Sequence, residues 1–200
     1  MRLHRPKARH FRRQAPVDLP KMSDAASHWA VETLRNGKRV EIRALRPEDR
    51  DPMLAAVGRV SAQSLYRRFF SAKRHFTEQE ASFFLNVDFV NHVALVAVVE
   101  EDGRPTIVGG GRYVVTKPGQ AEVAFAIIDK YQGQGIGAAL TRHLAQIARA
   151  AGLRELVAEV LPENVAMLKV FENSGLPMSR TTASGTVHVV LELIEPSRRE

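Results

Sequence analysis

The sequence of 200 residues contains no cysteine and no long uninterrupted apolar stretch. Without cysteine the chain has neither a disulfide framework nor a thiol nucleophile. The apolar run 93–99 is stopped by Glu100, Glu101 and Asp102, well short of the roughly 20 apolar residues that a membrane span requires. The N-terminus also lacks the apolar core of a secretory signal. These absences predict a cytoplasmic protein with no membrane partner.

The histidines are too scattered to suggest a metal site. No His-x-x-x-His or similar ligand spacing occurs among His75, His92, His143 and His188. We therefore expect no bound metal.

The positive charge is confined to one end of the chain. Residues 1–21 carry a net charge of +6, whereas the other 179 residues carry +1. A segment with so few apolar residues is typical of disorder. We expect a basic, disordered tail over 1–27, which is either merely solvated or contacts an acidic partner or RNA, and a single domain over 28–200. The body gives no support for nucleic-acid binding.

Apolar periodicity and turn residues predict a mixed α+β domain. Asn36 and Gly37 separate two alternating runs, 29–34 and 39–43, which is a strong hairpin signal. Glycines at 109–111 suggest a bulge or a close backbone approach. The other expected elements are a helical stretch over 47–70, a helix over 77–85, strands over 92–100, 106–115 and 121–128, a long helix ending near Gly152, a strand over 153–161, a helix over 164–174 and a strand over 187–194. This order implies an α/β fold with a mixed, mostly antiparallel sheet and helices on both faces.

A glycine-rich loop follows strand 121–128 and opens the long helix. Unpaired N–H groups at a helix N-terminus attract anions, and glycines remove the side chains that would block approach. A tight turn with no ligand is the simpler interpretation, but alternating glycines after an apolar strand favour a phosphate site. The loop consists of Gln132, Gly133, Gln134, Gly135, Ile136 and Gly137.

The same glycines also fit the dinucleotide fingerprint, as Gly133-x-Gly135-x-x-Ala138. That fold places the loop after its first parallel strand, with several βαβ units behind it. Here an antiparallel meander precedes the loop, and only 62 residues follow Ala138. A P-loop is excluded because no Gly-Lys-Ser/Thr closes the run.

The loop resembles the acetyl-CoA motif Q/R-x-x-G-x-G/A of the GNAT (GCN5-related N-acetyltransferase) family. Residues 164–176, from Asn164 to Leu176, are similar to the family's later asparagine-to-glycine segment, and the likeness extends over roughly 40–193. It implies a sheet with splayed central strands. The pantetheine arm of acetyl-CoA would lie in the gap, paired with the backbone of Phe125, Ala126 and Ile127. Residues 133–138 would hold the pyrophosphate, and Asn164 would bind near the pantetheine.

Acylation of an amine requires a base, because a lysine amine with a pKa of about 10.4 is protonated at neutral pH. Two carboxylates interrupt apolar strands, where ionised groups are rare without a partner. Glu122 resembles the base of the histone and bacterial protein lysine acetyltransferases, and Glu159 resembles that of the ribosomal-protein N-terminal acetyltransferases. The simpler reading places either residue on a solvent-facing side of its strand. Phe171 stands where many members carry a tyrosine that protonates the leaving thiolate.

The segment 64–70, Ser-Leu-Tyr-Arg-Arg-Phe-Phe, is similar to the bacterial branch that acetylates protein lysines, including those of acyl-CoA synthetases. The leading hypothesis is therefore an enzyme that moves acetyl from acetyl-CoA to a protein lysine, with Glu122 as general base. Two alternatives stay open. One is transfer to a small-molecule amine, and the other is a binding module that senses acyl-CoA without turnover.

Overall fold

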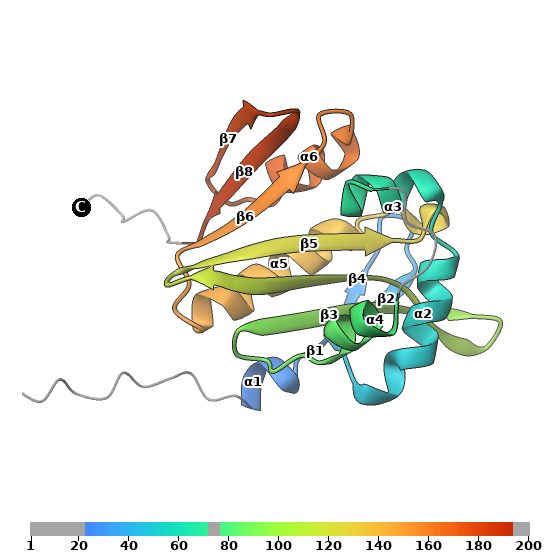
Figure 1. Ribbon diagram of the computed structural model, residues 1–200. Helices are drawn as coiled ribbons and strands as arrows, with labels where there is room; N and C mark the ends of the chain where they lie inside the picture. The colour runs from blue at the N-terminus through green and yellow to red at the C-terminus, as the bar shows by residue number, and fades with distance from the viewer. Residues whose placement is uncertain (1–22, 72–76, 194–200) are drawn as a thin grey trace, which may run out of the picture.

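A computed structural model describes residues 23–71 and 77–193, and its frame is one eight-stranded sheet (Figure 1). The strands are β1 (Trp29–Thr33), β2 (Arg39–Ala44), β3 (His92–Glu101), β4 (Arg104–Lys117), β5 (Gln120–Ile127), β6 (Glu155–Val160), β7 (Met178–Ala183) and β8 (Thr186–Glu192). They lie in the order β1-β2-β3-β4-β5-β6-β8-β7, and every neighbouring pair is antiparallel except β5 with β6. The predicted mixed, mostly antiparallel sheet is confirmed.

Helices cover both faces of this sheet, as predicted. The helical elements are α1 (Ser23–Ala26), η1 (Pro47–Asp49), α2 (Arg50–Gly58), α3 (Ala62–Phe69), α4 (Glu78–Leu85), η2 (Asp129–Tyr131), α5 (Ile136–Ala150) and α6 (Val165–Glu172). Adjacent residues of β4 point to opposite faces. A Cβ at Gly111 would lie 3.0 Å from Leu144 of α5, whereas Arg112 donates to the carbonyl of Phe84 in α4. Gly111 therefore permits close packing on α5, on the face opposite to α4.

The predicted turns and bulge are present. Asn36 and Gly37 turn the first hairpin, and the register between β3 and β4 shifts beside Gly109. One extra residue, Val108, accounts for this bulge, since Ala97 pairs with Gly109 and Val98 with Ile107.

The helical stretch expected over 47–70 is broken in two. Helix α2 ends at Gly58, and Ser61 begins α3 by accepting a hydrogen bond from the N–H of Ser64. Asp129 in η2 accepts hydrogen bonds from Ser61 N–H and from the hydroxyls of Ser61 and Ser64, each at 2.8 Å. The break therefore depends on a residue far away in the sequence.

Strand β7 was not predicted. It pairs with β8 across a tight turn at Ser184 and Gly185, both of which have positive φ. All of its residues after Met178 are exposed, so the strand lacks the alternation of apolar and polar residues that identifies a half-buried strand.

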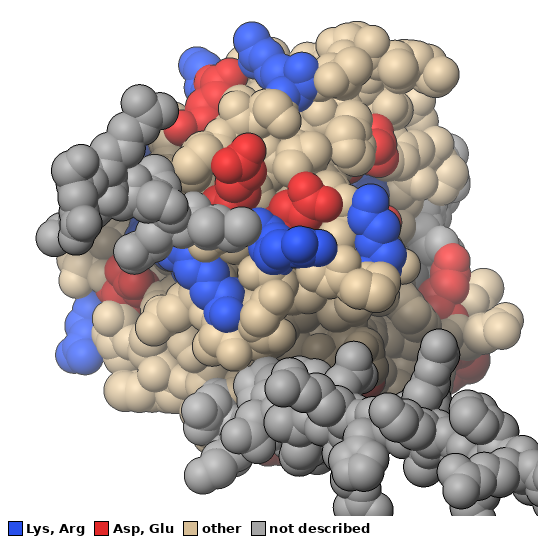
Figure 2. Space-filling model, turned by 90° about the vertical axis from the view of Figure 1, so that its left-hand side faces the viewer, with Lys and Arg blue, Asp and Glu red and all other residues tan. Residues whose placement is uncertain are grey.

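Ordered structure begins before residue 28, because Ser23–Ala26 form α1 and Ala25 packs against the core. The rest of the predicted tail, His75 and the last residue of the final predicted strand lie outside the described residues. Positive and negative side chains are interspersed on the face shown in Figure 2. No helix within 23–71 and 77–193 is long and apolar enough to cross a bilayer.

A buried ion pair fixes the connection between β2 and η1. Arg43 and Asp49 are only 8% and 4% exposed, and two guanidinium nitrogens of Arg43 donate to the two carboxylate oxygens at 2.6 and 2.8 Å. The N–H of Arg46 donates to the same carboxylate at 2.8 Å. Burial alone raises the pKa of Asp49, but these donors reverse the effect and lower its pKa.

Candidate active site

Strands β5 and β6 are paired only where they begin. Their parallel register joins residues 120–122 to 155–157 and then stops, and the strands diverge toward the right of Figure 1. The predicted splay is therefore present, and it leaves a groove of about 380 Å³. Most of the predicted site residues line it: Glu122, Phe125, Ala126, Ile127, Gln132, Gly133, Gly135, Ile136, Gly137, Ala138, Glu159 and Asn164.

The glycine loop presents a helix N-terminus to this groove. Gly133 and Gly135 have φ values of 73° and 105°, which only glycine adopts easily, and Gly135 caps α5 without a side-chain bond. The first N–H groups of a helix have no partner within the helix. Gly137 has a different function, because a Cβ there would lie 3.2 Å from Val170 of α6. The loop thus combines an anion-attracting end with close helix packing.

The two glutamines of the loop point in different directions. Gln132 lines the groove, and its amide donates to the carbonyl of Ile127 at 3.0 Å and to the hydroxyl of Ser64 at 3.2 Å. Gln134 is absent from the groove wall. Its amide donates to the carbonyl of Lys130 and accepts from Asn36, both at 2.8 Å. Gln134 therefore connects the loop to the first hairpin.

The backbone of β5 offers alternating groups to the groove. In an antiparallel pair, successive residues direct their N–H and C=O groups to opposite sides. The carbonyl oxygen of Ala126 lies against Gly109 of β4. The backbone of Phe125 and Ile127 therefore faces the groove, and the carbonyl of Ile127 is already engaged by Gln132. Phe125 has the least encumbered backbone of the three predicted contacts.

Glu122 is an exposed carboxylate on the β5 side of the groove. It has no hydrogen-bond partner within residues 23–71 and 77–193, but it lies near Arg68 of α3. Burial lowers the pKa of Arg68, and the charge of Glu122 partly offsets this effect. Arg67 also lines the groove, and its Nε is buried without a partner in the described chain. The region around Glu122 is therefore cationic.

Glu159 lies on the same face of the sheet, two residues after Val157, which pairs with Glu122. Unlike Glu122, it is already bonded. Its two oxygens lie 2.6 Å from Nδ1 of His188 and 2.9 Å from the hydroxyl of Thr186, both on β8. The structure brings the two candidate bases to one groove but leaves only Glu122 uncommitted.

Asn164 and Phe171 both have structural roles in α6. The side-chain oxygen of Asn164 caps the helix by accepting from the N–H of Met167 at 3.3 Å. Phe171 is 1% exposed, and its ring meets that of Phe125 with 6.0 Å between centroids. The buried phenyl group of Phe171 supplies no proton, as the phenylalanine at this position in the sequence already indicated.

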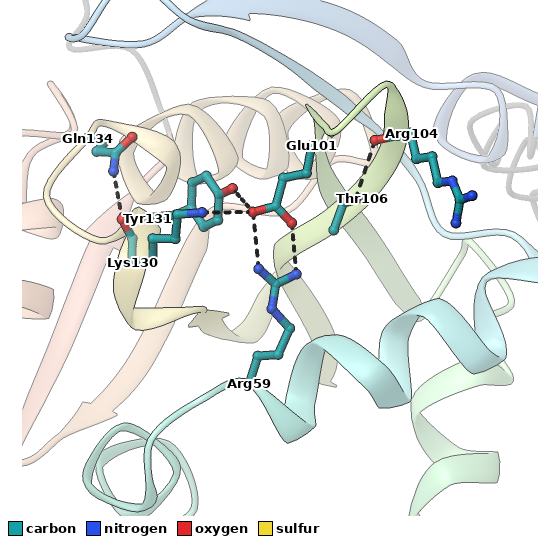
Figure 3. A network of polar contacts seen from close by, with 7 residues as sticks. All are labelled: Arg59, Glu101, Arg104, Thr106, Lys130, Tyr131 and Gln134. Atoms are coloured by element: carbon teal, nitrogen blue, oxygen red, sulfur yellow. Dashed lines mark hydrogen bonds and ion pairs between the residues drawn. The ribbon is translucent and has the colours of Figure 1, made fainter.

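A carboxylate outside the groove fixes one of its walls (Figure 3). Glu101, at the end of β3, accepts from Arg59 at 3.0 and 3.1 Å, from Lys130 at 3.1 Å and from the hydroxyl of Tyr131. The hydrogen bonds from Arg59 and Tyr131 lower the pKa of Glu101 to about 2. Since Tyr131 immediately precedes Gln132, this network joins the end of α2 to the glycine loop.

Sequence reasoning missed several residues of the groove wall. The N–H of Arg35 donates to the carbonyl of Gln134 at 3.1 Å, so the first hairpin lies against the glycine loop. No local sequence signal reveals this contact, because about a hundred residues separate Arg35 from Gln134. Arg67 and Arg68, by contrast, lie within the 64–70 segment that the sequence had already singled out. Among the missed residues are five with charged or hydroxyl-bearing side chains: Arg35, Arg67, Arg68, Tyr131 and Lys169. Within the described chain, no three His, Asp or Glu side chains are placed to hold a metal ion.

Comparison with known proteins decides the family. The profile of the acetyltransferase (GNAT) domain matches residues 39–177. The chain belongs to the GNAT acetyltransferase family. It is 37% identical over 141 residues to acetyltransferase PA5475 of Pseudomonas aeruginosa, covering 70% of this chain and 75% of that protein. It is 32% identical over 144 residues to acetyltransferase Pat of Mycolicibacterium smegmatis, covering 71% of this chain but only 42% of that longer protein.

Solved structures of GNAT proteins share the fold. The GNAT domain of S. lividans PAT superposes with a TM-score of 0.74 at 31% identity, over 82% of this chain and 96% of that one. The yncA protein of Salmonella typhimurium, described with its cofactor acetyl-CoA, superposes with a TM-score of 0.62 at 17% identity, over 80% of this chain and 98% of that one. By its family, the chain is an acetyltransferase.

Proposed function

We propose that this acetyltransferase transfers acetyl from acetyl-CoA to the side-chain amine of a protein lysine, with Glu122 as general base. One observation carries the proposal: an uncommitted carboxylate and a glycine-rich helix N-terminus line the same groove between two diverging strands. A donor bound along the groove would bring its thioester and the base together.

The groove offers a place for each part of the donor. The helix N-terminus at residues 133–138 suits the pyrophosphate, because its N–H groups and partial positive charge favour anions. The arm is amide-rich, and the free backbone groups of Phe125 suit it best among the predicted contacts. Asn164 offers a ligand its amide N–H groups and the second lone pair of its oxygen, since that oxygen accepts one hydrogen bond in capping α6.

Glu122 is the better base of the two candidates. A general base must accept a proton from the incoming amine, and Glu159 already accepts from His188 and Thr186. Arg68 adds a second contribution, because a cation near the acceptor favours the neutral form of an amine. The attacking lysine would thus lose its proton to Glu122 before or during attack on the thioester carbon.

No side-chain acid is required for the leaving group. A thiol has an ordinary pKa of about 8.5, so its thiolate leaves without full protonation. Phe171 has no proton to give, and the hydroxyl of Tyr131, although it lines the groove, donates to Glu101. The N-terminus of a helix or solvent suffices to stabilise the thiolate.

The lysine acceptor is supported by the 64–70 segment and by the similarity to Pat proteins. The test compares thiol release from acetyl-CoA with an acyl-CoA synthetase and with a panel of small amines. Release with the synthetase alone supports the lysine, and release with an amine alone supports the small-molecule alternative. If no acceptor yields release although acetyl-CoA binds, the protein is a sensing module and the proposal is wrong.

The base is tested by Glu122→Gln with Glu159→Gln as the matched control. Glu122→Gln should lower kcat by about a hundredfold or more, with unchanged affinity for acetyl-CoA measured by calorimetry. Glu159→Gln should reduce kcat far less. Near wild-type turnover in Glu122→Gln, or the larger loss in Glu159→Gln, would overturn the assignment.

A further inference from the structure

A second cavity lies beneath the sheet, between β3–β5 and helices α2–α4. Its volume is about 90 Å³. It shares part of its wall with the groove, namely Val60, Arg68, Ala124, Phe125 and Ala126. The two spaces therefore meet at β5, beside the backbone that we propose to hold the donor.

Small residues of the sheet create this cavity. Gly110 pairs with Ala126, and Arg112 pairs with Ala124, so these four residues point to the same face of the sheet. Three of them have no side chain beyond Cβ. The opposite wall consists of Met53, Ala56 and Val57 of α2 together with side chains of α3 and α4.

The size and lining of the cavity limit what it could hold. Most of its wall is apolar side chain or glycine backbone. The cavity has room for about two or three methylene groups, each roughly the size of a water molecule. Its position next to a ligand groove indicates an occupant that arrives with the ligand.

The arginines at its edge do not make the cavity an anion site. Arg112 donates to the carbonyl of Phe84 at 3.2 Å, lies 3.0 Å from Nε2 of His92, and stacks 4.4 Å above the ring of Phe84. Burial, with the nearby charge of Arg68, lowers the pKa of Arg112 to about 9. Arg68 has the charge of Glu122 close by. The remaining wall is apolar, so an apolar occupant is favoured.

We infer that this cavity is an acyl pocket for straight chains of up to five carbons, so that propionyl-CoA, butyryl-CoA and valeryl-CoA are donors besides acetyl-CoA. The inference rests on the proposed function, in which the arm pairs with the backbone of Phe125 and the thioester lies near Glu122. Ala124 and Ala126 flank Phe125 on β5 and point to the same face as Glu122. The carbons beyond the acetyl group then pass between these alanines and α2. Each buried methylene should strengthen donor binding about fourfold.

The test uses S-alkyl-CoA thioethers, which bind without reacting and need no acceptor. Calorimetry should show S-butyl-CoA binding roughly fifteenfold more tightly than S-ethyl-CoA, from two added methylenes at about fourfold each. Equal affinity for the two thioethers overturns the acyl pocket while leaving the proposed function intact. Failure of both to bind refutes the donor groove itself. Tighter binding of S-(3-carboxypropyl)-CoA than of S-butyl-CoA overturns the apolar occupant.

Variants of Val57 assign the effect to the cavity, because this residue lines the cavity but not the groove. Val57→Phe should fill the space and remove the preference for S-butyl-CoA, with S-ethyl-CoA affinity within about twofold of wild type. Ala55→Phe places the same side chain on the exposed side of α2 and should change neither. If Val57→Phe does not fold, Val57→Ala should extend the preference to S-hexyl-CoA, and an unchanged chain-length profile there overturns the inference.

Discussion

Asp49→Asn should destabilise the protein by about 3 kcal/mol, because it removes one partner of a buried ion pair. The carboxylate accepts two hydrogen bonds from Arg43 and one from the N–H of Arg46. Asparagine keeps one acceptor oxygen but no charge, and it leaves the Arg43 guanidinium with Glu41 as its remaining carboxylate, at 3.2 Å. Loss of a buried partner costs about 3–5 kcal/mol, and the retained oxygen favours the lower end.

Urea denaturation at pH 7 measures this loss, and thermal melting should show a decrease of roughly 6–12 °C for a chain of this size. The matched control is Glu78→Gln, which breaks the exposed pair of Arg50 with Glu78, where the nitrogen and oxygen are 2.6 Å apart. An exposed pair is worth about 1 kcal/mol or less. Similar losses in the two variants would refute the reasoning that burial decides the strength.

The same pair predicts a pH dependence. The pKa of Asp49 is lower in the folded protein than its ordinary value, so its contribution is complete above the unfolded pKa of about 3.9 and is lost as the pH falls through the folded pKa. The difference between wild type and Asp49→Asn should therefore be constant from pH 7 to 5 and shrink below pH 4. A constant difference down to pH 3 contradicts the lowered pKa.

Two further predictions concern the bulged strand and the network of Figure 3. Gly111→Ala should destabilise by about 1–3 kcal/mol in urea, because its Cβ would lie 2.7 Å from the ring of Phe125, whereas Gly58→Ala, which meets nothing within 4 Å, should stabilise by about 0.4–1 kcal/mol. Equal effects would contradict the close approach at Gly111. Glu101→Gln should weaken acetyl-CoA binding several-fold with little change in kcat, because it removes hydrogen bonds that hold the groove wall before the glycine loop. The control Glu100→Gln, at an exposed position, should leave both acetyl-CoA affinity and kcat unchanged.

Features decided by neighbours in sequence were predictable. The hairpin at Asn36 and Gly37, the glycine loop and the core face of α5 all follow from residues within one turn or one helix. The break in the helix before Ser61 was not predictable, because the carboxylate that secures it comes from Asp129. Periodicity reports burial along one element and carries no information about such a partner.

In the candidate site, too, features set by sequence neighbours were predictable, and features set by distant residues were not. The loop and both carboxylates could be identified, since a glycine pattern and a charged residue in an apolar strand are visible in the sequence. The sequence could not show that, within the described chain, Glu159 is hydrogen-bonded while Glu122 is not. His188 and Thr186 reach Glu159 only because β6 pairs with β8. The hairpin contact of Arg35 with the loop likewise exists only in the folded chain.

The divergence of β5 and β6 gives this sheet two interior edges in addition to its outer edges at β1 and β7. Proteins protect outer edges with short strands, charges or bulges, because unpaired backbone groups recruit other chains. Short strands, charges or bulges cannot protect an interior edge that admits a ligand, because each of them would obstruct the groove. Here side chains of α3 and α6 line the gap between the two strands instead. Under the proposed function, the gap accepts the slender, amide-bearing arm of acetyl-CoA rather than a whole strand of another chain.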